Sequence, residues 1–269
     1  LRARLKQGID GTGAYISAEF RNLQTGRWEE HFRSHVKDRD QTAIIGFSKD
    51  PGIAFIASNQ GQDKTAIYEY DASSRQRKEV LFQHRFFNAD RVLINPYRAS
   101  GEAFGEILGL GYEGPRGDDV EWTFPALRAL DAGLRQALAI ASVPVKLVDP
   151  ATGQSAMVEY PAEKDLSILD YTPDFKTVLV SVDGAATPPE YYLFRDGQLS
   201  LLAKSYPDID PKSLGRTELV YYKARDGLDI PAFLTRPDTE LCGAGPWPAV
   251  VHPHGGPWSR DTMGFDGAM

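Results

Sequence analysis

Short runs of β-branched and aromatic residues alternate with polar, turn-forming segments along most of the chain. Three runs are typical of β-strands because they are short, rich in strand-forming residues and bounded by Gly, Pro or Asp: 52–58, 66–70 and 177–182. The polar segments contain Gly, Asn, Asp and Ser, which favour tight turns. Four of these segments are predicted to form β-hairpins: 22–28, 71–77, 149–154 and 195–198. The pattern therefore predicts a mainly β protein.

The predicted hairpins recur at intervals that suit one architecture. Their centres, near Gly26, Ser74, Gly153 and Gly197, are 48, 79 and 44 residues apart. A propeller blade is a four-stranded antiparallel sheet of roughly 40 to 50 residues, so hairpins in a propeller repeat at about that period. The first and last intervals match one blade each. We expect residues 1–206 to form a partial β-propeller.

One segment departs from the strand pattern and accounts for the long interval. From 120 to 138, Leu and Phe recur every three or four residues with charged and polar residues between them. This periodicity predicts an amphipathic helix, and Pro125 suits its first turn. We expect a helical insertion that packs on the propeller, with docking of a partner as the alternative.

The character of the chain changes after residue 206. Residues 207–216 are polar and rich in turn formers, which is typical of a linker between domains. Beyond them, 218–223 and 228–235 predict an antiparallel hairpin. After a loop that contains Cys242, the apolar run 248–251 predicts one more strand. We expect a second domain over residues 217–269.

The most informative motif is His254-Gly255-Gly256-Pro257, which closely follows the strand predicted at 248–251. In hydrolases built on a strand, turn and helix sheet, a loop of this type supplies a backbone N–H to the oxyanion hole. Glycine lets the backbone take unusual dihedral angles and bring an amide close to a substrate carbonyl. Any strand can end in a Gly-Gly-Pro turn, but the preceding hairpin and strand favour the functional interpretation.

Residues 218–266 resemble the opening of the catalytic domain in the prolyl oligopeptidase family of serine peptidases, through YYKARDGLDIPAFLTRP, PWPAVVHPHGGPWSRD and GFD. The acylaminoacyl-peptidase or dipeptidyl-peptidase branch is the most similar. The resemblance implies a β-propeller followed by an α/β-hydrolase domain, with 217–269 as its first strands. It also implies hydrolysis of short peptides by a Ser-His-Asp triad. It assigns the backbone amide of Gly256 to the oxyanion hole and His254, Gly255 and Pro257 to the shape of that loop, and it implies no metal or cofactor.

The triad of the family is expected downstream of this sequence. Ser48 and Ser155 lack the closing glycine of a G-x-S-x-G elbow, and His254 does not match the family's catalytic histidine. Both ends of the chain look cut from something longer, so the chain alone is expected to be inactive. Two alternatives stay open: a noncatalytic propeller that serves as an interaction scaffold, and an esterase on the same scaffold.

Composition restricts the partners. The chain has 30 Lys and Arg against 37 Asp and Glu, a formal charge of −7, which argues against a general nucleic-acid binder. No apolar stretch approaches the roughly 18 to 20 residues of a membrane helix, so we expect no membrane partner. One cysteine, Cys242, excludes an internal disulfide framework and a cysteine-based zinc site. The compartment, cytoplasmic or periplasmic and secreted, stays open, as does oligomerisation.

Two motifs suggest cofactors and have simpler explanations. Gly109 to Gly114 fits G-x-G-x-x-G, but Pro115 follows where a dinucleotide-binding helix must begin. His31 and His35 have the spacing of a zinc-binding helix but lack a third ligand, so surface histidines are expected.

Two residue pairs also suggest binding sites. His252 and His254 share a face of an extended strand and could hold a metal, although the glycine loop explains them better. Glu29 and Glu30 are similar to the paired glutamates with which dipeptidyl peptidases of this family bind a substrate amine. On a strand, adjacent side chains point to opposite faces, so a shared amine site is not expected.

Overall fold

The computed structural model describes residues 2–256 and 259–267 and divides the chain into two compact units. Unit 1 comprises Leu1–Glu113 and Asp118–Leu127, and unit 2 comprises Gly114–Gly117 and Arg128–Met269. Both units are built mainly from antiparallel sheets, as the sequence predicted. No helix among the described residues is long and apolar enough to cross a membrane.

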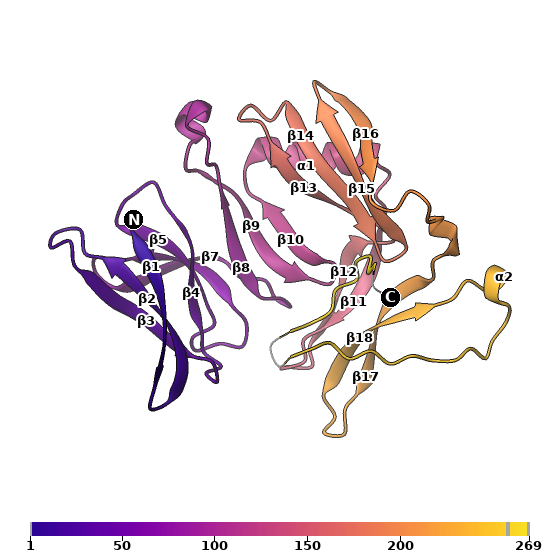
Figure 1. Cartoon of the computed structure of the whole chain (residues 1–269), viewed down its shortest axis with the longest axis horizontal. Helices are drawn as coiled ribbons and strands as arrows, with labels where there is room; N and C mark the ends of the chain where they lie inside the picture. The colour runs from indigo at the N-terminus through magenta and orange to yellow at the C-terminus, as the bar shows by residue number, and fades with distance from the viewer. Residues whose placement is uncertain (1, 257–258, 268–269) are drawn as a thin grey trace. The chain divides into compact units, whose positions relative to one another are not determined.

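Unit 1 contains three antiparallel sheets (Figure 1). The first has the order β1-β2-β3: Ala3–Asp10, Gly13–Arg21 and Trp28–His35. The second has the order β4-β5-β6-β7: Thr42–Phe47, Ile53–Ser58, Ala66–Asp71 and Gln76–Phe82. The third has the order β10-β9-β8: β8 is Ala89–Ile94, β9 is Ile107–Gly114 and β10 is Gly117–Trp122. A short 3-10 helix, η1 (Arg98–Ala103), lies between β8 and β9 in the chain.

The β4–β7 sheet lies between the other two and is covered on both faces. Alternate residues of a strand point to opposite faces, so one strand can supply two separate cores. Tyr68 of β6 packs with Phe20 of the first sheet, whereas the adjacent Ile67 packs with Leu110 of the third. All six residues of β5 are buried as a result. This explains why the sequence of β5 is almost uniformly apolar.

Unit 2 contains the remaining strands. A two-stranded sheet consists of β11 (Ser142–Val148) and β12 (Ser155–Pro161). A four-stranded sheet follows in sequential order: β13 (Asp165–Tyr171), β14 (Thr177–Gly184), β15 (Thr187–Arg195) and β16 (Gln198–Lys204). The last hairpin consists of β17 (Arg216–Lys223) and β18 (Asp229–Arg236). A short helix precedes it, η2 (Pro211–Ser213), and another follows it, α2 (Thr239–Cys242).

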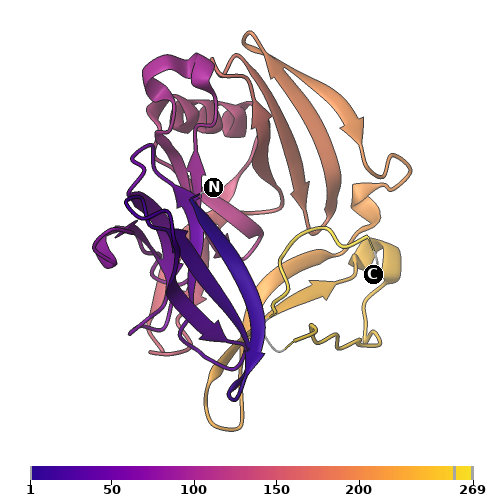
Figure 2. The same cartoon turned by 60° about the vertical axis from the view of Figure 1, so that its left-hand side comes forward.

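The predicted helix is α1, Pro125–Ala137. It begins later than residue 120 because Gly117–Trp122 instead forms β10, paired with β9. Leu134 and Leu138 are buried against Val178 and Val180 of β14, which confirms packing on a sheet (Figure 2). Pro125 opens the first turn, where a missing N–H costs little.

The four predicted hairpin turns all join neighbouring antiparallel strands: β2 to β3, β6 to β7, β11 to β12 and β15 to β16. Gly26, Gly153 and Gly197 take positive φ in three of them, and Arg75 does so in the fourth. The hairpin predicted at 218–235 is also present as β17 and β18. Local turn chemistry was therefore sufficient to place these connections.

Candidate functional site

The predicted strand at 248–251 does not form. Residues 248–256 are extended chain without a paired strand in the described part of the protein, and Val250 and Val251 are 92% and 90% exposed. A strand is stable only when a neighbour receives its N–H and C=O groups. The prediction was wrong for this structure, since no strand among the described residues pairs with 248–251.

The glycine loop itself is open. The Nδ1–H of His254 donates to the carbonyl oxygen of Gly255 at 2.5 Å, and a Cβ on Gly255 would meet no atom within 4 Å. Within the described residues, the exposed Gly256 amide has no hydrogen-bond partner. Pro257 lies outside the described residues. The loop thus leaves space next to an available amide.

The segment that follows the loop is anchored to the turn that joins β9 to β10. Arg260 Nη2 donates to the carbonyl oxygen of Gly114 at 2.8 Å, and Met263 N–H donates to that of Pro115 at 2.7 Å. Arg116, in the same turn, donates to the backbone of 161–163 and to Met263. Nothing local in the sequence marks Arg116, since its partners are 45 to 147 residues away.

A group of charged residues lies near this turn in unit 2. Arg135 of α1 forms ion pairs with Asp131, at 2.7 Å, and with Asp165 of β13. Burial opposes the charge of Arg135, but the two carboxylates outweigh it and raise its pKa. Burial raises the pKa of the Asp183 carboxyl, and the nearby Arg116 opposes that rise. The cluster ties α1 to the β13–β16 sheet.

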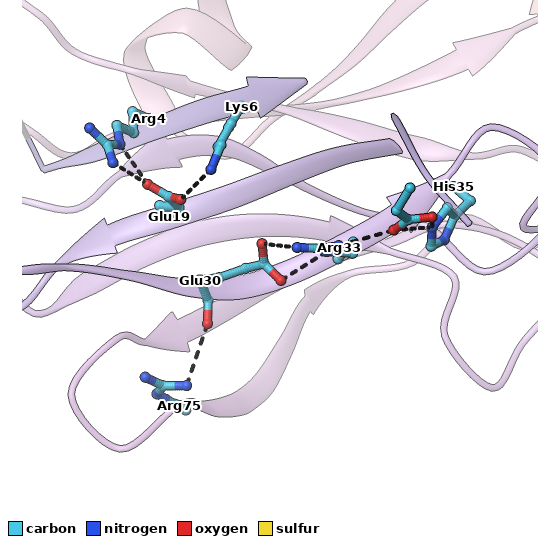
Figure 3. Close-up of polar contacts among 8 residues, drawn as sticks. Arg4, Lys6, Glu19, Glu30, Arg33, His35 and Arg75 are labelled. Atoms are coloured by element: carbon cyan, nitrogen blue, oxygen red, sulfur yellow. Dashed lines mark hydrogen bonds and ion pairs between the residues drawn. The ribbon is translucent and has the colours of Figure 1, made fainter. Parts of the chain in front are cut away.

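The paired glutamates are neighbours in β3, and Figure 3 shows Glu30 with Arg33. Glu30 accepts hydrogen bonds from Arg33 at 3.0 and 2.9 Å, whereas Glu29 accepts from Arg75 at 2.7 Å and from Asn22 at 2.8 Å. These bonds lower the pKa of both carboxyls. The two carboxylates are thus bonded to different arginines, although Arg75 also donates to the backbone carbonyl oxygen of Glu30 at 3.4 Å.

A cavity of about 250 Å³ lies within unit 1, and Glu29, His31 and Arg2 are among its lining residues. Each of these groups already has a partner. Arg2 donates to the carbonyl oxygens of Ser48 and Ile53 at 2.7 and 2.8 Å, and His31 Nδ1 lies 2.9 Å from the Tyr70 hydroxyl. Burial lowers the pKa of His31 and raises that of Tyr70 to about 12. These three lining groups are therefore already hydrogen-bonded within the protein.

The two cofactor-like motifs lie on strands. Gly109 and Gly111 belong to β9, where a Cβ would come within 2.7 Å of Val120 or Arg91 side-chain atoms, so these glycines serve close packing. His31 and His35 belong to β3 and are not on a helix; His35 contacts Asp10 at 3.1 Å. In the described part of the chain, no three His, Cys, Asp or Glu side chains are grouped to hold a metal ion. His252 and His254 both lie in exposed chain that forms no strand.

Two curated proteins are similar in sequence to almost the whole chain. Dipeptidyl aminopeptidase BIII of Pseudoxanthomonas mexicana is 26% identical over 250 residues, which cover 90% of this chain and 32% of that protein. Dipeptidyl peptidase family member 6 of Caenorhabditis elegans is 22% identical and covers 98% of this chain and 35% of its own length. The chain thus spans about a third of the length of these relatives. No protein-family model matches it.

Two solved structures of prolyl peptidases align with much of this chain. A chain from a study of two prolyl endopeptidases aligns with a TM-score of 0.46 and 14% identity, covering 87% of this chain and 31% of that chain. Prolyl oligopeptidase B from Galerina marginata, bound to a 25mer macrocyclization substrate, aligns with a TM-score of 0.46 and 12% identity, covering 88% and 31%.

Proposed function

We propose that this chain, a relative of the prolyl oligopeptidase family of serine peptidases, is the portion of such a peptidase that carries several propeller blades and the start of the catalytic domain. Residues 1–206 supply blades, 207–216 the linker and 217–269 the opening of an α/β-hydrolase domain. The substrate is a short peptide.

Similarity to two dipeptidyl peptidases is the observation that carries this proposal, because it extends through both units of the chain. The arrangement of unit 1 supports it. Its antiparallel sheets stack face to face, with the β4–β7 sheet buried on both sides, and this is how consecutive blades pack in a propeller. A lone two-layer sandwich would bury only one face of each sheet.

The chemistry follows from the residues assigned by resemblance. A serine encoded beyond residue 269 attacks the substrate carbonyl after a histidine takes its proton, and a carboxylate orients that histidine. The N–H of Gly256 donates to the oxyanion that develops. His254, Gly255 and Pro257 shape the loop that presents this amide. The exposed Gly256 amide and the empty space beside Gly255 support the assignment.

The test is active-site labelling of the complete gene product. A fluorophosphonate probe is expected to label the complete protein, and not the 269-residue chain or a complete protein whose elbow serine is changed to alanine. The coding sequence after Met269 is expected to contain a G-x-S-x-G elbow, then an Asp and a His. A stop codon directly after Met269 would favour the interaction scaffold. Comparing dipeptide anilides with simple esters separates a peptidase from an esterase.

A further inference from the structure

The segment after the glycine loop both donates hydrogen bonds to the turn between β9 and β10 and accepts one from it. Met263 N–H donates to Pro115 O at 2.7 Å, while Met263 O accepts from Arg116 Nη1 at 3.4 Å. Arg260 adds a charged donor to Gly114 O at 2.8 Å. Gly114 and Pro115 are themselves buried, so the acceptors are fixed in position. The segment is thus docked through its backbone at Met263 and through a side chain at Arg260.

Arg116 connects this contact to the rest of unit 2. Its guanidinium donates to Pro161 O at 3.0 Å, to Ala162 O at 2.9 Å and to Glu163 O at 3.4 Å, in addition to Met263 O. A guanidinium has five donors in a rigid plane and can serve several carbonyls at once. A lysine ammonium has three donors on one nitrogen and cannot span the same set.

A second contact fixes the far end of the segment. The rings of Phe265 and Tyr206 are 5.0 Å apart between centroids. A Cβ at Gly267 would come within 2.3 Å of the Tyr206 hydroxyl oxygen, so the backbone at Gly267 lies close to the end of the Tyr206 side chain. Residues 260–267 are therefore restrained at both ends.

The glycine loop, by contrast, makes few contacts of its own. Its residues 252–256 are exposed, and His254 bonds only to the neighbouring Gly255 among the described contacts. Gly256 precedes Arg260 by four residues, so their α-carbons lie at most about 14 Å apart. An oxyanion donor must be aimed to within about 0.5 Å. Fixing Arg260 therefore confines the Gly256 amide to the region that these four residues can reach, and further contacts of the loop must complete its alignment.

We propose that Arg116 and Arg260, with the turn Gly114–Gly117, form an arginine clamp that positions the Gly256 amide. Both arginines are positioning residues, since neither is placed against substrate. The role in positioning rests on the proposed peptidase function, whereas the clamp itself is a property of this chain. It couples the turn between β9 and β10 to the loop that presents the oxyanion donor.

The clamp is tested in this chain by amide hydrogen exchange, followed by NMR. The Met263 amide is expected to be protected, and Arg116→Ala, Arg116→Lys and Arg260→Ala are each expected to reduce its protection by about tenfold or more. Arg195→Ala, an exposed arginine of the same unit, is the matched control. Circular dichroism and the protection of β14 amides verify that each variant is folded. An unprotected Met263 amide in the parent chain, or unchanged protection in folded Arg116→Lys and Arg260→Ala, would overturn the clamp.

The positioning role is tested in the complete peptidase. Arg116→Lys and Arg260→Ala are expected to lower kcat by about tenfold with KM nearly unchanged, because a misaimed oxyanion donor weakens transition-state binding selectively. Unchanged kcat in variants that have lost Met263 protection would overturn the positioning role. A complete protein without the serine of a G-x-S-x-G elbow would instead refute the peptidase proposal. The hydrogen-exchange result for the clamp would still stand.

Discussion

Gly184 packs directly against the carbonyl oxygen of Glu163, so closely that a Cβ at residue 184 would come within 2.0 Å of that oxygen. We expect Gly184→Ala to lower the free energy of unfolding by about 2 to 3 kcal/mol, because backbone must move to accept the methyl group. Gly133 is the matched control, since a Cβ there meets nothing within 4 Å. Gly133→Ala in α1 is expected to raise that free energy by about 0.5 to 1 kcal/mol. Urea unfolding measures both, and equal effects would contradict the contact.

The ion pairs of Arg135 with Asp131 and Asp165 connect α1 to β13. We expect Arg135→Met to lower the free energy of unfolding by about 2 kcal/mol, since it leaves partly buried carboxylates without their donor. Gln136→Met, at an exposed position of the same helix, is expected to change it by less than about 0.5 kcal/mol. Similar losses in the two variants would show that the ion pairs contribute nothing.

Asp183 is expected to make the stability of the folded protein depend on pH. Burial raises its pKa in the folded state, so the folded protein retains the proton after the unfolded chain has released it. The contribution of Asp183 to stability is present below the ordinary Asp pKa and is lost as the pH rises through the raised value. Asp183→Asn is therefore expected to match the parent chain near pH 3 and to exceed its stability at pH 7. A variant that is less stable than the parent at pH 7 would contradict this.

His84 is held in its neutral form by its surroundings. Its Nδ1 accepts hydrogen bonds from the N–H groups of Phe86 and Phe87 at 3.1 and 3.2 Å, and its ring stacks on Tyr112 at 4.5 Å. Burial lowers its pKa from the model-peptide value of 6.5. An NMR titration of the ring protons, assigned with His84→Gln, is expected to give a pKa below that value. The contribution to stability is present above the unfolded pKa and is lost as the pH falls through the folded one; a midpoint above 6.5 would exclude this environment.

The proposed role of Gly256 can be measured in the complete gene product, with a peptide substrate. Gly256→Val is expected to lower kcat by about 100-fold, because a β-branched residue distorts the loop that aims the oxyanion donor. Gly133→Ala, far along the chain in α1, serves as the control for a glycine replacement and is expected to leave kcat unchanged. Normal kcat in Gly256→Val would remove Gly256 from the oxyanion assignment.

The elements that sequence predicted are those whose causes are local. The turn at 195–198 needs only Asp-Gly between two strand-forming runs, and Gly197 takes the positive φ that this requires. The helical face of Leu130, Leu134 and Leu138 follows from residue spacing alone. The start of α1 was placed too early because Val120, which fits the helical period four residues before Phe124, is held in β10 by pairing with β9.

Some features of the candidate site depend on local sequence, and others depend on contacts between distant segments. The motif at 254–257 is visible in the composition alone, and its role in an oxyanion hole stays a prediction. Whether 248–251 becomes a strand depends on neighbours that the run itself does not specify, and in this structure it stays unpaired. Arg116 was missed for a related reason, since an arginine that serves distant carbonyls has no pattern in its own segment.

The sequence by itself determined where this chain turns, where its one long helix lies and which segment resembles an oxyanion loop, since each depends on residues within a few positions of one another. Only the tertiary structure decided that β5 is buried on both faces, that Gly184 admits no side chain and that Arg116 joins residues 161–163 to Met263. These features depend on contacts between segments far apart in the chain, and such contacts exist only once the sheets have packed.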